Sequence, residues 1–235
     1  YDGDYNFELT VSDSGCDGTT ASTGAQTLVD AGVIGIAGAA CSGATLGAIG
    51  AASDAGVVMV SYASTSPEIT DYDDDGYLFR VVPSDAQQGL ALAAVAKEEG
   101  FSYPAILYMT NDYAYGLADA FFNEWYYEMD NDYCFELDYN QATTNFASEV
   151  AYIDDYDCDS VVMVTYATDG ALIVEEMAAQ GIDIPILGGD GIAGLSFADE
   201  FSDESLVDGV IAITPASSDS SEESQAFDEA YEEAG

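Results

Sequence analysis

Short runs of apolar and β-branched residues alternate along the chain with longer stretches whose apolar residues recur every three or four positions. The short runs, bounded by glycine or polar residues, are typical of buried strands, and the longer spacing is typical of helices that cover a sheet. The predicted strands are 7–11, 33–37, 57–61, 78–82, 105–108, 133–138, 160–165, 184–187 and 207–213. The predicted helices are 19–30, 42–55, 85–99, 115–129, 146–153, 170–180, 195–201 and 221–234.

This repeated strand–helix order predicts an α/β fold class. Strands that alternate with helices form parallel sheets with helices on both faces. The extended segment 80–85, which Pro83 interrupts, is the expected boundary between two lobes. In such sheets, ligands lie beyond the carboxyl ends of the strands. The rule selects the loops that begin at Cys41, Ser61, Thr110, Thr165 and Gly188.

The charge balance is extreme, because 45 acidic residues stand against two basic ones, Arg80 and Lys97, for a net charge of −43. Nucleic acids and anionic membrane surfaces are excluded as partners, since both require lysine and arginine to neutralise phosphate. Adaptation to high salt and screening by divalent cations each account for such a balance, because self-repulsion at this charge opposes a compact state.

Several kinds of catalytic chemistry are missing. The chain has no histidine, which excludes Ser-His-Asp and Cys-His arrangements. Lys97 lies in a predicted helix beside Glu98 and Glu99, which is a poor setting for a Schiff base. The glycines at 35 and 38 are not followed by the Gly-Lys-Ser/Thr of a phosphate loop. We therefore predict that the protein is not an enzyme, and a hydrolase that uses carboxylates alone is the remaining catalytic alternative.

Six short motifs follow the predicted strands in order. They are ACSGAT at 40–45, SYASTSPE at 61–68, FRVVPSD at 79–85, NDYAYG at 111–116, TYATD at 165–169 and GGDG at 188–191. Through these motifs the chain resembles the branched-chain amino acid (Leu/Ile/Val-type) substrate-binding proteins of ABC importers, which have the type I periplasmic-binding fold. The resemblance covers nearly the whole chain, but the family is longer, so the fold is expected to be incomplete at both ends.

The resemblance implies two Rossmann-like lobes, joined by hinge strands, that close on a ligand. Residues 1–82 with 213–235 would form a partial first lobe, and residues 83–212 would form the second.

The cysteines favour disulfides. The chain has no Cys-x-x-Cys spacing and no histidine for a mixed zinc site, so disulfides in an oxidising compartment are favoured over four buried thiols. Three pairings are open, of which Cys16–Cys41 with Cys134–Cys158 is favoured, because each pair then lies within one lobe. The resemblance also implies the first of these two bridges.

The resemblance further implies a binding site for a zwitterionic amino acid. Hydroxyls and backbone N–H groups would hold the ligand carboxylate, an acidic side chain would accept from its ammonium in place of the glutamate common in the family, and aromatic rings would surround it. The matching residues are Ser42, Ser64 and Thr65 for the carboxylate, Asp190 for the ammonium, and Tyr113 and Tyr166 for the rings.

Each of these residues also has a purely structural interpretation. Ser42 fits a helix cap, and Asp190 fits a turn between glycines. Ser64 and Thr65 fit a turn before Pro67, and the tyrosines fit ordinary packing. Asp169 and Tyr62 are better interpreted as rim or surface residues. No arginine or lysine lies in the predicted binding loops, which argues against acidic amino acids and phosphorylated solutes. A neutral amino acid is therefore expected.

An acidic turn at 71–76 copies part of a calcium loop. Asp71, Asp73 and Asp75, followed by Gly76, match the opening of an EF-hand. The twelfth position is Val82, where a bidentate glutamate is required, so the full motif fails. A solvated acidic turn is preferred over a weak calcium site, and no other cofactor is expected.

Together with these observations, the resemblance implies an extracytoplasmic solute-binding protein that captures a neutral, branched-chain or other aliphatic amino acid for the membrane subunits of an ABC importer. It is expected to be a monomer in the periplasm or outside the cell, where a lipid anchor would be one means of retention. One alternative is a ligand-sensing receptor ectodomain of the same fold. Another is a cation-screened surface or filament-forming protein that reuses the fold.

Overall fold

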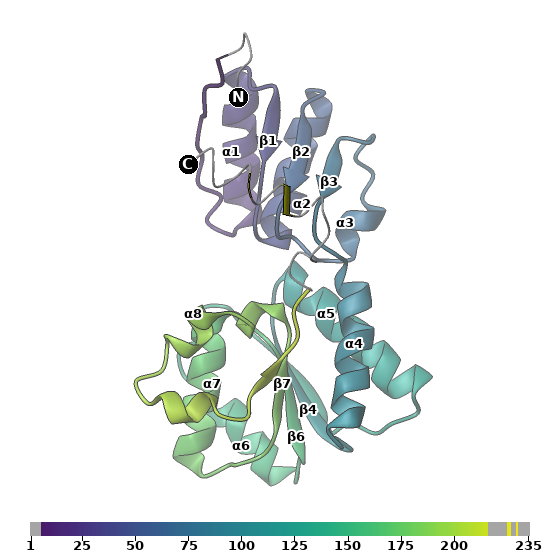
Figure 1. The fold of residues 1–235 in the computed structure, drawn as a ribbon, viewed down its shortest axis with the longest axis vertical. Helices are drawn as coiled ribbons and strands as arrows, with labels where there is room; N and C mark the ends of the chain where they lie inside the picture. The colour runs from purple at the N-terminus through teal and green to yellow at the C-terminus, as the bar shows by residue number, and fades with distance from the viewer. Residues whose placement is uncertain (1–5, 216–224, 227–228, 230–235) are drawn as a thin grey trace.

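The protein forms two α/β units, each built on a parallel sheet flanked by helices (Figure 1). The structure is a computed structural model that describes residues 6–215, 225–226 and 229. The first sheet has the strand order β1-β2-β3 and the second has the order β5-β4-β6-β7-β8. Every strand pairing is parallel, so the predicted α/β class with parallel sheets is confirmed.

The first unit extends from α1 to β3. Its elements are α1 (Gly18–Asp30), β1 (Gly35–Ala37), α2 (Ser42–Asp54), β2 (Val58–Ser61), α3 (Glu68–Asp71) and β3 (Leu78–Arg80). Small residues allow α1 and α2 to pack closely, since a Cβ added at Gly47 would lie 2.2 Å from the carbonyl oxygen of Gly18. The core beneath these helices is correspondingly small and is built mainly from alanines with Ile49 and Met59.

Apolar side chains remain exposed on this first sheet. Val58, Val60 and Phe79 are 40%, 36% and 54% exposed. The structure assigns no strand to 7–11, so that prediction is wrong. Alternating apolar residues form a strand only where a neighbouring backbone completes the ladder, and the ladders of the described chain do not include this segment.

The second unit carries the larger core. Its strands are β4 (Pro104–Met109), β5 (Phe135–Tyr139), β6 (Ser160–Val164), β7 (Ile186–Gly188) and β8 (Ile211–Ala212). Its helices are α4 (Asp85–Glu98), α5 (Asp112–Phe122), α6 (Ala147–Asp155), α7 (Ala167–Gln180) and α8 (Leu195–Ala198). Every residue of β4 and of β6 is buried, as expected for central strands that helices cover on both faces.

The helices begin where short polar side chains satisfy their free N–H groups. Asp17 accepts from the backbone of the first turn of α1, Ser84 does so for α4, and Asn111 does so for α5. Ser84, rather than Asp85, is thus the cap of α4, and Asp85 is left as the first residue of the helix.

The predicted helix 115–129 is present but changes type along its length. It begins at Asp112 as α5 and continues as a π-helical turn, Asn123–Glu128. Trp125 lies in this turn, fully buried, and its indole N–H donates to the carbonyl oxygen of Asp132 at 2.7 Å. The turn therefore anchors the chain between α5 and β5.

Two disulfides join the cysteines in the favoured pairing. Cys16 is bonded to Cys41, with their Cα atoms 5.3 Å apart, and this bridge connects the entrances to α1 and α2. Cys134 is bonded to Cys158, with their Cα atoms 5.5 Å apart, and this bridge connects the entrance to β5 with the end of α6. The described residues contain no helix long and apolar enough to cross a membrane.

The two predicted elements at the C-terminal end, strand 207–213 and helix 221–234, are confirmed only in part or lie largely outside the described residues. The predicted strand 207–213 is reduced to β8, because the 3-10 turn Glu204–Val207 occupies the start of that range. The predicted helix 221–234 lies for the most part outside the described residues.

Candidate functional site

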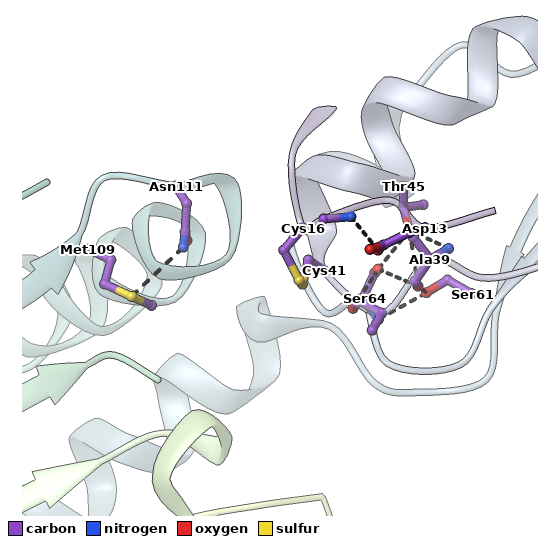
Figure 2. Close-up of a disulfide and its surroundings, with 11 residues drawn as sticks. Asp13, Cys16, Ala39, Cys41, Thr45, Ser61, Ser64, Met109 and Asn111 are labelled. Carbon is purple, nitrogen blue, oxygen red and sulfur yellow. Dashed lines mark hydrogen bonds between the residues drawn. A yellow bond between two sulfur atoms is a disulfide. The ribbon is translucent and has the colours of Figure 1, made fainter. Parts of the chain in front are cut away.

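Hydroxyl groups gather where β1 and β2 end, beside the Cys16–Cys41 bridge (Figure 2). The Ser64 hydroxyl lies 2.8 Å from the Thr45 hydroxyl and donates to the carbonyl oxygen of Ala40 at 3.0 Å. Its backbone N–H donates to Ser61 Oγ at 3.0 Å. Ser64 is thus occupied in holding its own loop, and its contact with a ligand stays a prediction.

Ser42 connects two of the predicted binding loops. Cys41, not Ser42, occupies the cap position of α2, and Ser42 is the first helical residue. Its Oγ accepts from the backbone N–H of Ser66 at 3.1 Å, and the side chain is buried. A serine hydroxyl that accepts one hydrogen bond still has its own hydrogen to donate. Ser42 therefore has a donor available at the positive end of a 13-residue helix.

Thr65 carries a buried hydroxyl without a hydrogen-bond partner among the described residues. Its carbonyl oxygen accepts from the backbone N–H of Asp85 at 2.8 Å and from Arg80 Nη1 at 3.0 Å. Buried hydroxyls are nearly always hydrogen-bonded. An unpartnered one at the end of β2, in the predicted binding loop, is what a site for a polar ligand would contain.

Arg80 corrects the expectation that no basic residue lies near these loops. Its guanidinium donates to the carbonyl oxygens of Thr65 and Ser66, the latter at 2.8 Å, and to the hydroxyl of Thr70. Strand pairing of β3 with β2 brings this side chain under the loop, which the sequence spacing did not reveal. Because these contacts engage three of its five N–H donors, Arg80 stabilises the loop.

Asp190 is held at the end of β7 by two side chains of the second unit. Its Oδ1 accepts from the Tyr113 hydroxyl at 2.8 Å and from Gln88 Nε2 at 3.1 Å, and its backbone N–H donates to Gln88 Oε1 at 2.9 Å. The next residue must be glycine, since a Cβ at Gly191 would lie 2.3 Å from the carbonyl oxygen of Thr165. The turn is therefore pressed against β6, which fixes the position of the carboxylate.

The two predicted ligand tyrosines are stacked on each other. The rings of Tyr113 and Tyr166 are 5.4 Å apart and almost parallel, at 6°. Burial, with the charge of Asp190, raises the pKa of Tyr113 well above its usual value and that of Tyr166 to about 12. Both phenols therefore stay protonated at neutral pH.

Asp85 is a buried carboxyl that was not among the predicted site residues. It is fully buried, its Oδ1 accepts from Gln88 Nε2 at 2.8 Å, and its Oδ2 has no partner among the described residues. Burial is the main cause that raises the pKa of Asp85 to about 7, and the negative charge of Asp190 adds to it. The Thr65 hydroxyl opposes this shift, although no hydrogen bond of ordinary geometry joins the two side chains.

One polar network therefore spans both units. It runs from the loops at the end of the first sheet to those at the end of the second, through Ser42, Thr65, Asp85, Gln88, Asp190, Tyr113 and Tyr166. The structure thus brings together five of the six predicted site residues. The sixth, Ser64, holds its own loop through hydrogen bonds to neighbouring residues. Sequence reasoning missed Asp85 and Gln88 as site residues, although Asp85 ends both the FRVVPSD motif and the predicted lobe boundary, and Gln88 follows three positions later.

The units touch beside this network. A Cβ at Gly43, on α2, would lie 2.5 Å from Asp112 Oδ2 on α5, and a Cβ at Gly116 would lie 2.6 Å from Pro67 Cδ. Two of the hollows in the described part of the chain lie elsewhere. One, of about 390 Å³, lies between segment 8–14 and α1 with β1, and the other, of about 590 Å³, lies beside β7 and β8.

The weaker candidates lie apart from the network. Tyr62 is exposed, and burial raises the pKa of Asp169 beside the Tyr139 hydroxyl. In the acidic turn it is Asp74 that organises the backbone, by accepting from the N–H groups of Gly76 and Leu78. Within the described residues, no group of three or more acidic or cysteine side chains is placed to hold a metal ion. Asp71, Asp73 and Asp75 are thus not gathered into a calcium site there.

Comparison with known proteins places this chain in one family. The whole chain, residues 1–235, matches the family described as the receptor family ligand binding region. The protein therefore belongs to that family, whose members are ligand-binding and receptor proteins.

Solved structures show the fold in more detail. The chain superposes on the leucine-binding protein LivK of Thermotoga maritima with a TM-score of 0.85 and 25% identity, over 96% of this chain and 64% of LivK. It superposes on the branched-chain amino acid binding protein LivJ of Streptococcus pneumoniae, solved with isoleucine, with a TM-score of 0.72 and 28% identity, over 82% of this chain and 55% of LivJ. The chain thus has the type I periplasmic-binding fold and spans less than two thirds of these relatives.

A receptor also matches over a shorter stretch. A probable metabotropic glutamate receptor of Caenorhabditis elegans, mgl-1, is 35% identical over 68 residues, which are 29% of this chain and 7% of the receptor.

Proposed function

We propose that this protein captures a neutral amino acid between its two units and delivers it to an ABC importer. The observation that carries the proposal is the polar network at the carboxyl ends of both sheets. It offers unused hydroxyl donors on one unit and carboxylate acceptors on the other. A zwitterion requires both at once, and ligands of open parallel sheets bind at this edge.

The ligand carboxylate would lie on the first unit. Ser42 and Thr65 each have a hydroxyl hydrogen to donate, and the start of α2 favours a negative charge. Ser64 would contribute by fixing the loop, because its hydroxyl is engaged with Thr45 and Ala40. Each hydroxyl bond to a charged carboxylate contributes about 1.5–3 kcal/mol.

The ligand ammonium would lie on the second unit. Asp190 and Asp85 each present a second carboxylate oxygen in addition to the one that Gln88 engages, and Tyr166 lies beside Asp190 through its stack on Tyr113. A positive group between two carboxylates would relieve their mutual repulsion. An acidic side chain on the ligand would add repulsion to Asp85 and Asp190, and three of the five N–H donors of Arg80 are engaged by the loop, so a neutral side chain is favoured.

The relatives support an aliphatic ligand. LivK is a leucine-binding protein, LivJ was solved with isoleucine, and a substrate-binding protein of Desulfitobacterium hafniense, 25% identical with a TM-score of 0.70, was solved with leucine. We take leucine, isoleucine and valine as the first candidates. The disulfides support an oxidising, extracytoplasmic location, and we expect no enzymatic activity.

The proposed lobes are 1–82 with 213–235, and 83–212. Because α2 and α5 touch beside the network, a ligand would enter after the lobes part, and the lobes would then close over it. A closed, liganded monomer is the form that we expect the importer to recognise.

A panel of amino acids tests this proposal. In thermal-shift and calorimetric titrations, leucine, isoleucine or valine should bind, and Ser42→Ala and Asp190→Asn should each raise Kd about tenfold or more. Ser22→Ala and Asp54→Asn, which alter exposed residues of the same types, should leave Kd unchanged. If no neutral amino acid binds the unaltered chain, the proposal is wrong.

A receptor ectodomain is the second candidate, and the local match to a metabotropic glutamate receptor favours it. In the same panel, tighter binding of glutamate than of leucine would support this alternative.

A further inference from the structure

One carboxamide holds two buried or half-buried carboxylates. Gln88 Nε2 donates to Asp85 Oδ1 at 2.8 Å and to Asp190 Oδ1 at 3.1 Å, and Gln88 Oε1 accepts from the backbone N–H of Asp190 at 2.9 Å. All the polar atoms of this side chain are therefore used to set the two acids side by side. Asp85 Oδ2 remains buried and unpartnered among the described residues.

The surroundings supply little positive charge to this pair. The groups that face Asp85 are Gln88 on its own helix, Arg80 at the end of β3, Thr65, Asp190, and the hydroxyls of Tyr113 and Tyr166. Arg80 is the one cation among them, and its guanidinium is bonded to Thr65, Ser66 and Thr70. Two carboxylates in such a place do not both ionise freely without a cation.

We infer that Gln88 is a positioning residue that makes Asp85 and Asp190 one acceptor for a single cationic group, and that Asp85 releases a proton to solvent when the ligand ammonium binds. The inference rests on the proposed function, because it assigns the ammonium to this pair. In the step, the O–H bond of Asp85 breaks and its proton goes to the buffer. The ammonium keeps its three hydrogens, so the charge of the occupied pair is the same before and after.

The pKa of Asp85 sets the pH range in which ligand binding releases a proton. Burial, with the charge of Asp190, raises the pKa of Asp85 to about 7, so the free protein keeps this proton at about pH 6 and loses most of it at about pH 8. Since ammonium binding favours the ionised acid, affinity should rise with pH across this range. If only the ionised form binds, Kd is about tenfold lower at pH 8 than at pH 6.

Calorimetry in paired buffers tests the inference on the 235-residue chain. L-Leucine is titrated at about pH 6, 7 and 8 in phosphate and in a buffer of high ionisation enthalpy, and the difference in heat gives the protons released. We expect close to one proton per leucine at the lowest pH and few at the highest. Asp85→Asn should release none, and its Kd should not change with pH.

Variants of the helix separate positioning from general damage. Gln88→Ala should weaken leucine binding and shift the rise in affinity to higher pH. The reason is that the two acids lose their shared donor, which favours the ionised form of Asp85. Gln87→Ala, an exposed glutamine one position earlier on α4, should keep both the affinity and the profile.

The outcomes distinguish the two proposals. Leucine binding with no proton release and an equal Kd at each pH would overturn this inference and leave the proposed function intact. A pH profile of Gln88→Ala that matches the unaltered protein would overturn the positioning role. No binding of leucine, isoleucine or valine at any pH would overturn the proposed function and this inference with it.

Discussion

Replacing Asp85 by asparagine should stabilise the protein above neutral pH. Asp85 lies in the first turn of α4 with no exposed surface. Asparagine keeps an oxygen for the bond from Gln88, and its amide can donate where Asp85 Oδ2 now lacks a partner, beside the buried hydroxyl of Thr65. The variant therefore removes a titrating charge with little change in packing.

The magnitude follows from the shift in pKa. The pKa of Asp85 rises from 3.8 to about 7 on folding, and a rise of this size corresponds to about 4 kcal/mol. Because the folded state holds a proton that the unfolded state has lost, Asp85 makes the free energy of unfolding fall as pH rises, until the fall levels off above about pH 7. The asparagine variant does not lose stability in this way. Its free energy of unfolding should therefore exceed that of the unaltered protein by an amount that grows to about 4 kcal/mol at pH 8.

Urea denaturation at a series of pH values measures this difference. Trp125 is the single tryptophan and is buried against α5, so its fluorescence reports unfolding of the unit that holds α4. Asp54→Asn, an exposed acid, controls for the loss of one negative charge and should give a small difference that does not vary with pH. Equal unfolding free energies of the Asp85 variant and the unaltered protein at pH 8 would refute the reasoning.

Three further predictions concern stability. Raising the salt concentration should raise the midpoint of thermal unfolding, because counterions screen the repulsion within a chain of net charge −43, and an unchanged midpoint would contradict this. Replacing Cys134 and Cys158 together by serine should lower the free energy of unfolding by about 3 kcal/mol in urea, since their bridge closes a loop of 24 residues, and equal midpoints would show that the bridge contributes nothing. Gly89→Ala should destabilise by about 1–3 kcal/mol, because its Cβ would lie 2.5 Å from that of Ala120, whereas Gly50→Ala, which meets open space, should not destabilise in the same assay.

Most of the fold could be predicted, because its signals are local. The strand β2 lies mostly in the apolar run 57–60, which Gly56 and Ser61 bound, so its placement needs no knowledge of distant residues. The failure at 7–11 has the opposite cause, since a strand depends on a backbone neighbour that the alternation of side chains does not specify. Helix types within a long apolar stretch, such as the π-helical turn around Trp125, are likewise decided by packing.

The candidate site was predictable only in part. Ser42, Thr65 and Asp190 lie in motifs that the resemblance covers, so sequence reasoning could locate them. Asp85 also lies in one of these motifs, at the end of FRVVPSD at 79–85, but it is one of 45 acidic residues, and no pattern in the chain distinguishes a buried carboxyl from a solvated one. Its burial results from the packing of α4 between the two sheets' ends, where Thr65 and Asp190 approach it from opposite units.

Recognition of a zwitterion by the polar network is the central claim, and titration with three related compounds tests it most directly. L-Leucine carries both charged groups, 4-methylpentanoate lacks the ammonium, and isoamylamine lacks the carboxylate. In calorimetry at about pH 8, leucine should bind one-to-one, and each analogue should bind at least about a hundredfold more weakly, since it leaves one half of the network unpaired. Equal affinity for all three compounds, or no affinity for leucine or another neutral amino acid, would contradict the account.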